Sequence, residues 1–554
     1  MRGPRTVLLV FTETKPQLSN RFLGIDLSTN RAEQPILREE KAARLSDNLP
    51  ATIKYISQAA QLSNPDGTIV FEIRSTCALL SEYADSLQGS GLADIVVYRR
   101  FFWELEKCAN GWELHQSSPD GVNAYSGMHF AVKWDQGRGP LAAAPEARIQ
   151  GRAAWGNKAV VCAWLGRLPA GLYLGTLFDN SAAAIVPKNR AHLAAIWCFV
   201  SSPEFLREVR KINHKPQVAN ATLVKVPFDL AYWQGAAAEK YPDGLPMPSS
   251  GDPTQWLFDG HPQRSDQPLH VAVSRLLGYR WPRQTGYSLL DCPALAADGL
   301  EAQADDDGIV CVSATKGEAT AAERLRGLLL RALGKFDPRD LIFNAGPRGS
   351  KAETLEEWLR DEFFEQHCEL FHHRPFIWHI WDGHKSGFSA LVNYHQLTHA
   401  NLEKLAYAYL GDWIRRQQAA VDAGEAGSDA RLQAAKQLQV RLKLILDGEP
   451  PYDIFVRWKP ASKQAIGWSP DINDGVRVNI RPFATADVLR KRVKIEWEKD
   501  RGREPVRDKD DFPWFWGWDE KEQDFAGVGD APDGNRWNDC HYTNEFKRKA
   551  NAAR

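Results

Sequence analysis

The 554-residue sequence has almost no net charge, few cysteines and no long apolar run. Its formal charge is −1, from 69 basic and 70 acidic residues, so any nucleic-acid binding must come from local patches. The 8 cysteines include no Cys-x-x-Cys pair. This argues against a zinc ribbon or a disulfide framework and favours a reducing, cytoplasmic compartment. Because no run approaches the roughly 18 apolar residues of a membrane helix, we expect no membrane partner.

The hydrophobic pattern changes along the chain. Short strand-like runs such as Asp94–Phe102, Val160–Leu165 and Ala182–Pro187 dominate the first half, whereas helical periodicity marks 319–334, 354–371 and 399–447. We therefore predict an α+β, multidomain protein. The predicted divisions are a sheet remnant at 1–60, a β-rich domain at 61–235, a linker or wrapping segment at 236–318, a helical domain at 319–449 and a basic, aromatic tail at 450–554.

Two groups of sequence strings carry a resemblance to a known family. The first includes Gly151-Arg152-Ala153-Ala154-Trp155-Gly156, Leu174–Asn180 and Asn220–Asp229. The second includes Arg374–Trp378 and Asn473–Phe483. Together they resemble the target-recognition region and tail of large adenine-specific DNA methyltransferases of fused restriction–modification systems, including those of BREX and DISARM phage defence.

The catalytic motifs of that family are missing from the sequence. Thr6–Phe11 and Phe22–Leu27 resemble its last catalytic strands, which predicts a truncated or split enzyme with a separately encoded N-terminal half. No glycine-rich turn for S-adenosylmethionine and no Asn/Asp-Pro-Pro-aromatic loop for a flipped adenine is found. Glu449-Pro450-Pro451-Tyr452 comes nearest, but it follows a predicted helix and is interpreted as a helix terminator. We predict no catalytic and no cofactor-binding residue here, with S-adenosylmethionine expected in the complete enzyme.

Basic and amide side chains gather in and around the first group of strings. Lysines can neutralise phosphates, and asparagine can read the edge of adenine. The alternative is that the lysines are ordinary solvated residues and the asparagines cap turns. The predicted DNA-binding residues of this first patch are Lys188, Asn189, Lys211, His214, Lys215, Asn220 and Lys225.

A second basic patch lies in the tail and is interleaved with Trp458 and Trp468. Such a mixture suits a surface that follows the phosphate backbone. Arg490-Lys491-Arg492 extends the patch, and acidic neighbours dilute its charge. The alternative is a tail held across the protein's own surface by salt bridges. The predicted DNA-binding residues of this second patch are Arg457, Lys459, Arg477, Asn479 and Arg481.

Histidines are concentrated between His367 and His399, but their spacing does not place ligands on one face, so we predict no metal site. The resemblance implies the DNA-recognition portion of a site-specific adenine-N6 methyltransferase, inactive alone. Double-stranded DNA, the missing catalytic half and other defence-system proteins are the expected partners. The alternative function is a non-enzymatic DNA-binding or assembly subunit of a defence complex.

Overall fold

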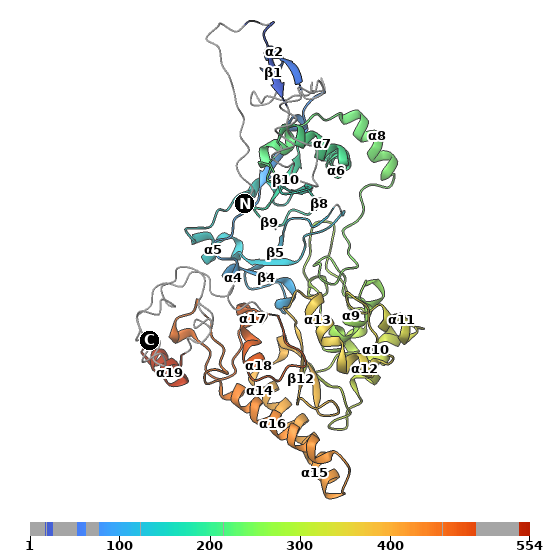
Figure 1. The fold of residues 1–554 in the computed structure, drawn as a ribbon, viewed down its shortest axis with the longest axis vertical. Helices are drawn as coiled ribbons and strands as arrows, with labels where there is room; N and C mark the ends of the chain where they lie inside the picture. The colour runs from blue at the N-terminus through green and yellow to red at the C-terminus, as the bar shows by residue number, and fades with distance from the viewer. Residues whose placement is uncertain are drawn as a thin grey trace.

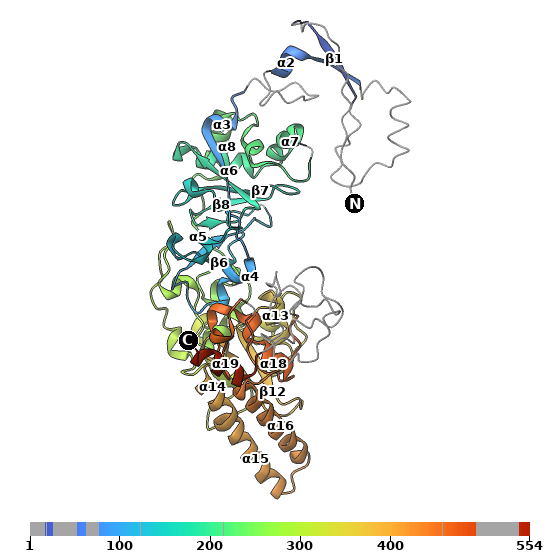
Figure 2. The same ribbon diagram turned by 90° about the vertical axis from the view of Figure 1, so that its left-hand side faces the viewer.

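A computed structural model describes residues 17, 19–25, 53–62, 77–121, 123–213, 215–456, 458–494 and 542–553. The described elements are stacked along one long axis, from strand β1 at one end to helix α15 at the other (Figures 1 and 2). Helices and several separate sheets confirm the α+β prediction. Among the described residues, no helix is both long enough and apolar enough to cross a bilayer.

The first described elements form a two-stranded antiparallel sheet. Strand β1 (Arg21–Ile25) pairs along its length with β2 (Ile53–Ser57), which leads directly into α2 (Gln58–Leu62). This confirms a strand within Phe22–Leu27. The other predicted strand, Thr6–Phe11, lies outside the described residues.

Residues 77–241, here called the β module, contain two four-stranded sheets. The first is antiparallel throughout, in the order β3 (Ala84–Gln88), β10 (Ala182–Pro187), β7 (Ala159–Ala163) and β8 (Ala170–Tyr173). The second has the order β4 (Arg99–Phe101), β6 (Phe130–Lys133), β5 (Trp112–Gln116) and β9 (Leu177–Phe178). The short helices of the module are α3 (Leu80–Tyr83), α4 (Ile95–Tyr98) and α5 (Pro140–Ala143).

The first sheet of the β module is buried on both faces. Val160 and Cys162 of β7 pack with α6 (Leu193–Val200), α7 (Pro203–Ile212) and α8 (Leu230–Lys240). Val161, the residue between them, packs on the opposite face with Tyr173 and Phe178. This alternation is the two-residue period of a strand, and it explains why every residue of β7 is apolar.

Residues 242–494 and 542–553 form the C-terminal module around the three-stranded sheet β11 (Ile309–Cys311), β13 (Ser389–Asn393) and β12 (Ile377–Trp381). One group of helices comprises α9 (Pro268–Leu276), α10 (Ala321–Leu333), α11 (Pro338–Phe343), α12 (Leu355–Asp361) and α13 (Phe363–Leu370). The helical periodicity of 399–447 is confirmed by α14 (His399–Glu403), a π-helical stretch (Lys404–Tyr409), α15 (Leu410–Asp422) and α16 (Ser428–Asp447).

Two segments predicted to be loose belong to the core of the C-terminal module. Within 236–318, every residue of α9 from Leu269 to Leu276 is buried, and Trp256 and Trp281 are fully enclosed. Within the predicted tail, α17 (Val476–Asn479) and α18 (Arg481–Thr485) bury Phe483 beside Trp468. Helix α19 (Asn544–Ala552) is anchored by a fully buried ion pair between Lys547 and Asp453. Both segments are therefore packed into the protein in their described parts, although residues 241–261 form neither helix nor strand and are compatible with the predicted wrapping segment.

Buried polar contacts join the two modules. The Arg100 guanidinium of β4 donates to the carbonyl of Asn473 (2.9 Å), and the Trp112 indole donates to the Asn473 side chain (2.7 Å). The Glu104 carboxylate accepts from the backbone N–H of Val476 (2.9 Å) and of Phe101 (3.0 Å). These contacts hold the β module against the segment before α17.

Candidate nucleic-acid interface

The first predicted patch is divided between the two ends of the first sheet. Lys188 and Asn189 follow the C-terminal end of β10, near the start of β7. Lys215 lies at the other end, where the neighbouring Pro216 carbonyl accepts from Gly166 N–H in the turn after β7. A strand as long as β10 spans roughly 17–20 Å. The patch is therefore two groups and not one cluster, and His214 lies outside the described residues.

Several polar groups of the first patch already have partners in the protein. Lys188 Nζ donates to the Ser81 carbonyl (2.8 Å), and Lys211 pairs with Glu208 (2.8 Å). Asn189 Oδ1 accepts from Ala191 N–H (3.0 Å) and so caps the short helix that follows β10. These contacts match the alternative in which the residues are capping or solvated surface groups.

Asn220 and Lys225 lie in and just after a short helix beside β3 and are half-buried. The Asn220 side chain accepts from Ala221 N–H (2.7 Å) and approaches the Ser86 carbonyl of β3 (3.5 Å). Its position is thus fixed by the sheet edge.

Three exposed arginines of the β module, here called the arginine surface, were not predicted: Arg148, Arg152 and Arg190. Arg148 pairs with Gly91 beyond the Gln88 end of β3, whereas Arg190 follows β10 at the Lys188 end. Arg190 donates to Asn157 Oδ1 (3.3 Å), and the Arg152 guanidinium lies 5.7 Å from the Trp134 ring and 5.6 Å from the Trp155 ring. In the sequence, Arg152 was marked only by its place in the Gly151–Gly156 string. Trp134, whose ring it contacts, lies outside that string.

The second predicted patch is mostly internal. Asn479 is fully buried and donates to Tyr394 Oη (2.8 Å) and to the Asp471 carbonyl (2.9 Å), so its prediction as a DNA contact is wrong for this structure. Lys459 Nζ is paired with Asp474 (2.6 Å) and Asp471 (2.9 Å). Arg477 and Arg481 are half-buried, and Arg457 lies outside the described residues. Salt bridges within the protein, the alternative interpretation, thus account for Lys459.

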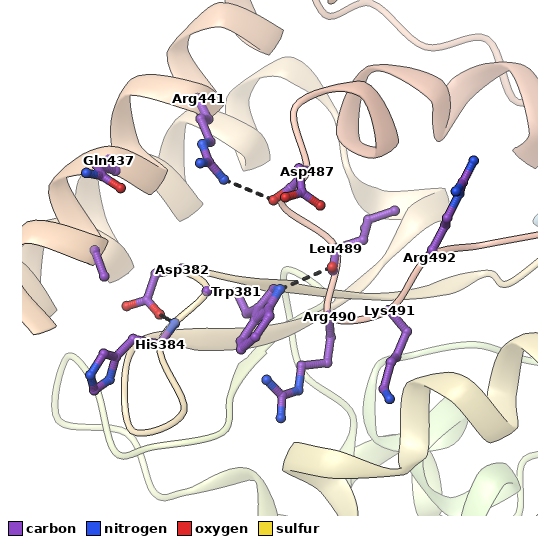
Figure 3. Close-up of a pocket in the computed structure, with 12 residues that line it drawn as sticks. Trp381, Asp382, His384, Gln437, Arg441, Asp487, Leu489, Arg490, Lys491 and Arg492 are labelled. Carbon is purple, nitrogen blue, oxygen red and sulfur yellow. Dashed lines mark hydrogen bonds between the residues drawn. The ribbon is translucent and has the colours of Figure 1, made fainter.

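Arg490, Lys491 and Arg492 instead contribute to a cleft of about 540 Å³ in the C-terminal module (Figure 3). Sequence reasoning missed Arg441 and Gln437, which α16 brings to the same cleft and whose spacing of four residues places them on one helical face. The Arg441 guanidinium donates to the Asp487 carbonyl (3.1 Å).

The cationic side chains of this cleft interact mostly with other groups of the protein. Arg490 pairs with Asp361 (2.6 Å), donates to the Arg360 carbonyl (2.9 Å) and stacks over Trp381 at 4.0 Å. Lys491 pairs with Glu365 (3.1 Å). The Asp382 carboxylate accepts from two backbone N–H groups and holds the adjacent turn, while burial raises its pKa. The cleft can attract anions, but most of its charge is balanced.

The Gly89-Ser90-Gly91 turn after β3 is not arranged to bind S-adenosylmethionine. Strands β2 and β10 lead into helices without glycine. Gly89-Ser90-Gly91 does follow β3, but a Cβ at Gly89 would collide with the Asp179 backbone. The N–H groups of Ser90 and Gly91 already donate to Phe178 and Arg148 carbonyls. These glycines permit close packing of the backbone, and their N–H groups are not free for a ligand.

Other candidate motifs have structural roles. Glu449 follows α16 and accepts from Asn544 N–H (3.1 Å) at the start of α19.

Burial lowers the pKa of His379 to about 3 and of His395 to about 4, so both are neutral at pH 7. Among the described residues, no group of His, Cys, Asp or Glu is arranged to hold a metal ion.

Comparison with known proteins finds a distant relative. A stretch of 141 residues is 26% identical to the adenine-specific methyltransferase BrxX of Escherichia coli O9:H4 (strain HS). This stretch covers 24% of the chain and 11% of BrxX, so the match spans only a small part of that relative. No protein-family model matches the chain. The similarity is therefore to a small part of an adenine-specific methyltransferase.

Proposed function

We propose that this chain supplies DNA recognition to a site-specific adenine-N6 methyltransferase of a restriction or phage-defence system. The similarity to BrxX carries the proposal, because BrxX is an adenine-specific methyltransferase. Methyl transfer would be performed by sequence outside these 554 residues, since the cofactor and base-binding motifs are absent from them. S-adenosylmethionine would bind to that other part.

The arginine surface supports DNA contact. Its three guanidinium groups are exposed, and none has a carboxylate partner among the described residues. Such groups can replace condensed counterions on the phosphate backbone. Because the whole chain is nearly neutral, exposed cations such as these are what would attract DNA.

Duplex binding as a function of salt tests the proposal. We expect Arg148→Gln/Arg152→Gln/Arg190→Gln to reduce the slope of log affinity against log salt by up to about 0.9 for each phosphate that is no longer neutralised. A matched control is Arg326→Gln/Arg331→Gln/Lys335→Gln on and after α10, where three exposed cations are neutralised in the other module. An equal slope for both triple variants would contradict the assigned surface, and no duplex binding by the wild type would refute the function.

The second candidate is a DNA-binding or assembly subunit that never takes part in methylation. It is favoured by the absence of catalytic motifs from the sequence. Co-expression with a catalytic partner separates the two candidates. Restored adenine methylation in the recovered DNA supports the recognition part of an enzyme, whereas a stable complex that leaves adenine unmethylated supports the subunit.

A further inference from the structure

The loop at residues 151–157, here called the Gly151 loop, is held rigidly at both ends. Gly151 has φ of 71°, and a Cβ there would lie 2.6 Å from the Gln88 carbonyl oxygen and 2.8 Å from the Phe178 ring. Only glycine can therefore bring the loop so close to the end of β3. At its other end, Gly156 N–H donates to the Gly175 carbonyl (2.9 Å).

Arg152 is presented by this rigid loop with its hydrogen-bonding groups free. Its guanidinium lies beside the rings of Trp134 and Trp155, which meet edge to face at 5.7 Å. Its side chain makes no hydrogen bond or ion pair within the described residues, and it is exposed. Contact with aromatic rings restricts an arginine without using its donors.

The polar side chains that follow β10 are engaged with other groups of the protein, and of these Arg190 reaches the Gly151 loop. Lys188 donates to the Ser81 carbonyl, the oxygen of Asn189 caps a helix, and Arg190 donates to Asn157. A flexible cation is sufficient for phosphate, whose contacts carry no sequence information. A positioned guanidinium with free donors is what bidentate recognition of a base edge requires.

We propose that Arg152 is a specificity-determining residue that reads guanine in the major groove of duplex DNA. The guanidinium would donate two parallel hydrogen bonds to O6 and N7 of the base. This inference rests on the proposed DNA-recognition function and deepens it. One good bidentate contact discriminates against the wrong base by roughly 5- to 150-fold.

The test is a competition among duplexes with randomised positions, using the full chain. Arg152→Lys keeps the positive charge but loses the planar guanidinium that can donate two parallel hydrogen bonds. It should therefore retain the slope of log affinity against log salt while losing the preference for a G·C pair at one position. Arg148→Lys, a neighbouring exposed arginine without ring contacts among the described residues, is the matched control and should keep that preference. Equal melting temperatures of the variants establish that the fold is intact.

Three results would overturn the assignment. The first is an Arg152→Lys variant with the wild-type base preference. The second is an Arg152→Ala variant that loses affinity equally for every sequence while Arg152→Lys is unaffected, because that pattern indicates phosphate contact. The third is duplex binding by the wild type with no preference at all. A wild type that binds no duplex would instead refute the DNA-recognition function itself.

Discussion

Gly475→Ala should loosen the junction between the two modules. Gly475 has φ of 88° and ψ of 162°, a conformation that is essentially restricted to glycine. An added Cβ would lie 2.7 Å from Arg100 Nε and 2.9 Å from Glu104 Oε2. Neither side chain can move away cheaply, because both are buried and hydrogen-bonded to backbone groups across the junction.

The expected cost has two parts. The backbone conformation costs alanine about 1–3 kcal/mol. Crowding of a packed site costs about a further 1–3 kcal/mol. Gly286→Ala is the control, because Gly286 also has positive φ, at 95°, but an added Cβ there meets nothing within 4 Å. The control, whose ψ is 4°, should therefore show the cost of a left-handed backbone without crowding.

Urea denaturation followed by tryptophan fluorescence compares the two variants. Trp112 lies at the junction, where it donates to Asn473, and it is one of the 20 tryptophans that contribute to the signal. We expect the midpoint to fall further for Gly475→Ala than for Gly286→Ala. Equal urea midpoints for the two variants would refute the idea that Arg100 and Glu104 cannot shift to make room for a Cβ at Gly475.

Three further predictions concern single side chains. Asn189→Ala should lower the unfolding free energy by about 1 kcal/mol through loss of the helix cap, and Asn189→Ser should restore it in the same denaturation assay. The pKa of His395 is lowered to about 4 by burial, so only the unfolded chain takes up its proton below about pH 6.5 and stability falls as pH drops. His395→Phe, which keeps the ring against Tyr279, should lose less melting temperature on acidification than the wild type. Lys547→Met removes the buried partner of the Asp453 carboxylate in this ion pair and should destabilise the docking of α19 by about 3–5 kcal/mol, seen as faster proteolytic release of the C-terminus.

Long, periodic elements could be predicted from the sequence, and short ones could not. The helices α10 and α16 and the strand β10 lie where periodicity indicated. Asp94–Phe102, expected as one strand, forms the helical turn α4 and only then β4. The Asp94 side chain caps Val96 N–H (2.9 Å), a local contact that outweighs the strand propensity of the Ile-Val-Val run. Helices as short as α17 and α18 contain too few residues to show a period.

The candidate site was harder to predict because it depends on contacts between distant residues. Composition identified a basic stretch around Asn479, but burial against Tyr394 is decided by tertiary packing. Lys188 and Lys215 were predicted as one patch, yet the pairing of β10 with β7 places them at opposite ends of a sheet. Arg152 is distinguished by its position beside Trp134, which no pattern in the Gly151 loop itself could reveal.

The junction and the arginine surface have one physical requirement in common. Base readout needs a recognition group held to within about half an ångström, so its support must be rigid over its full length. Arg152 is supported by the first sheet of the β module, and that module is held through Arg100 and Glu104 against the segment that contains Asn473. Under the proposed function, the predicted basic tail would therefore contribute to recognition in a different way. Its residues around Gly475 position the module that carries the arginines, which is why a defect there should weaken sequence preference without removing any group that faces DNA.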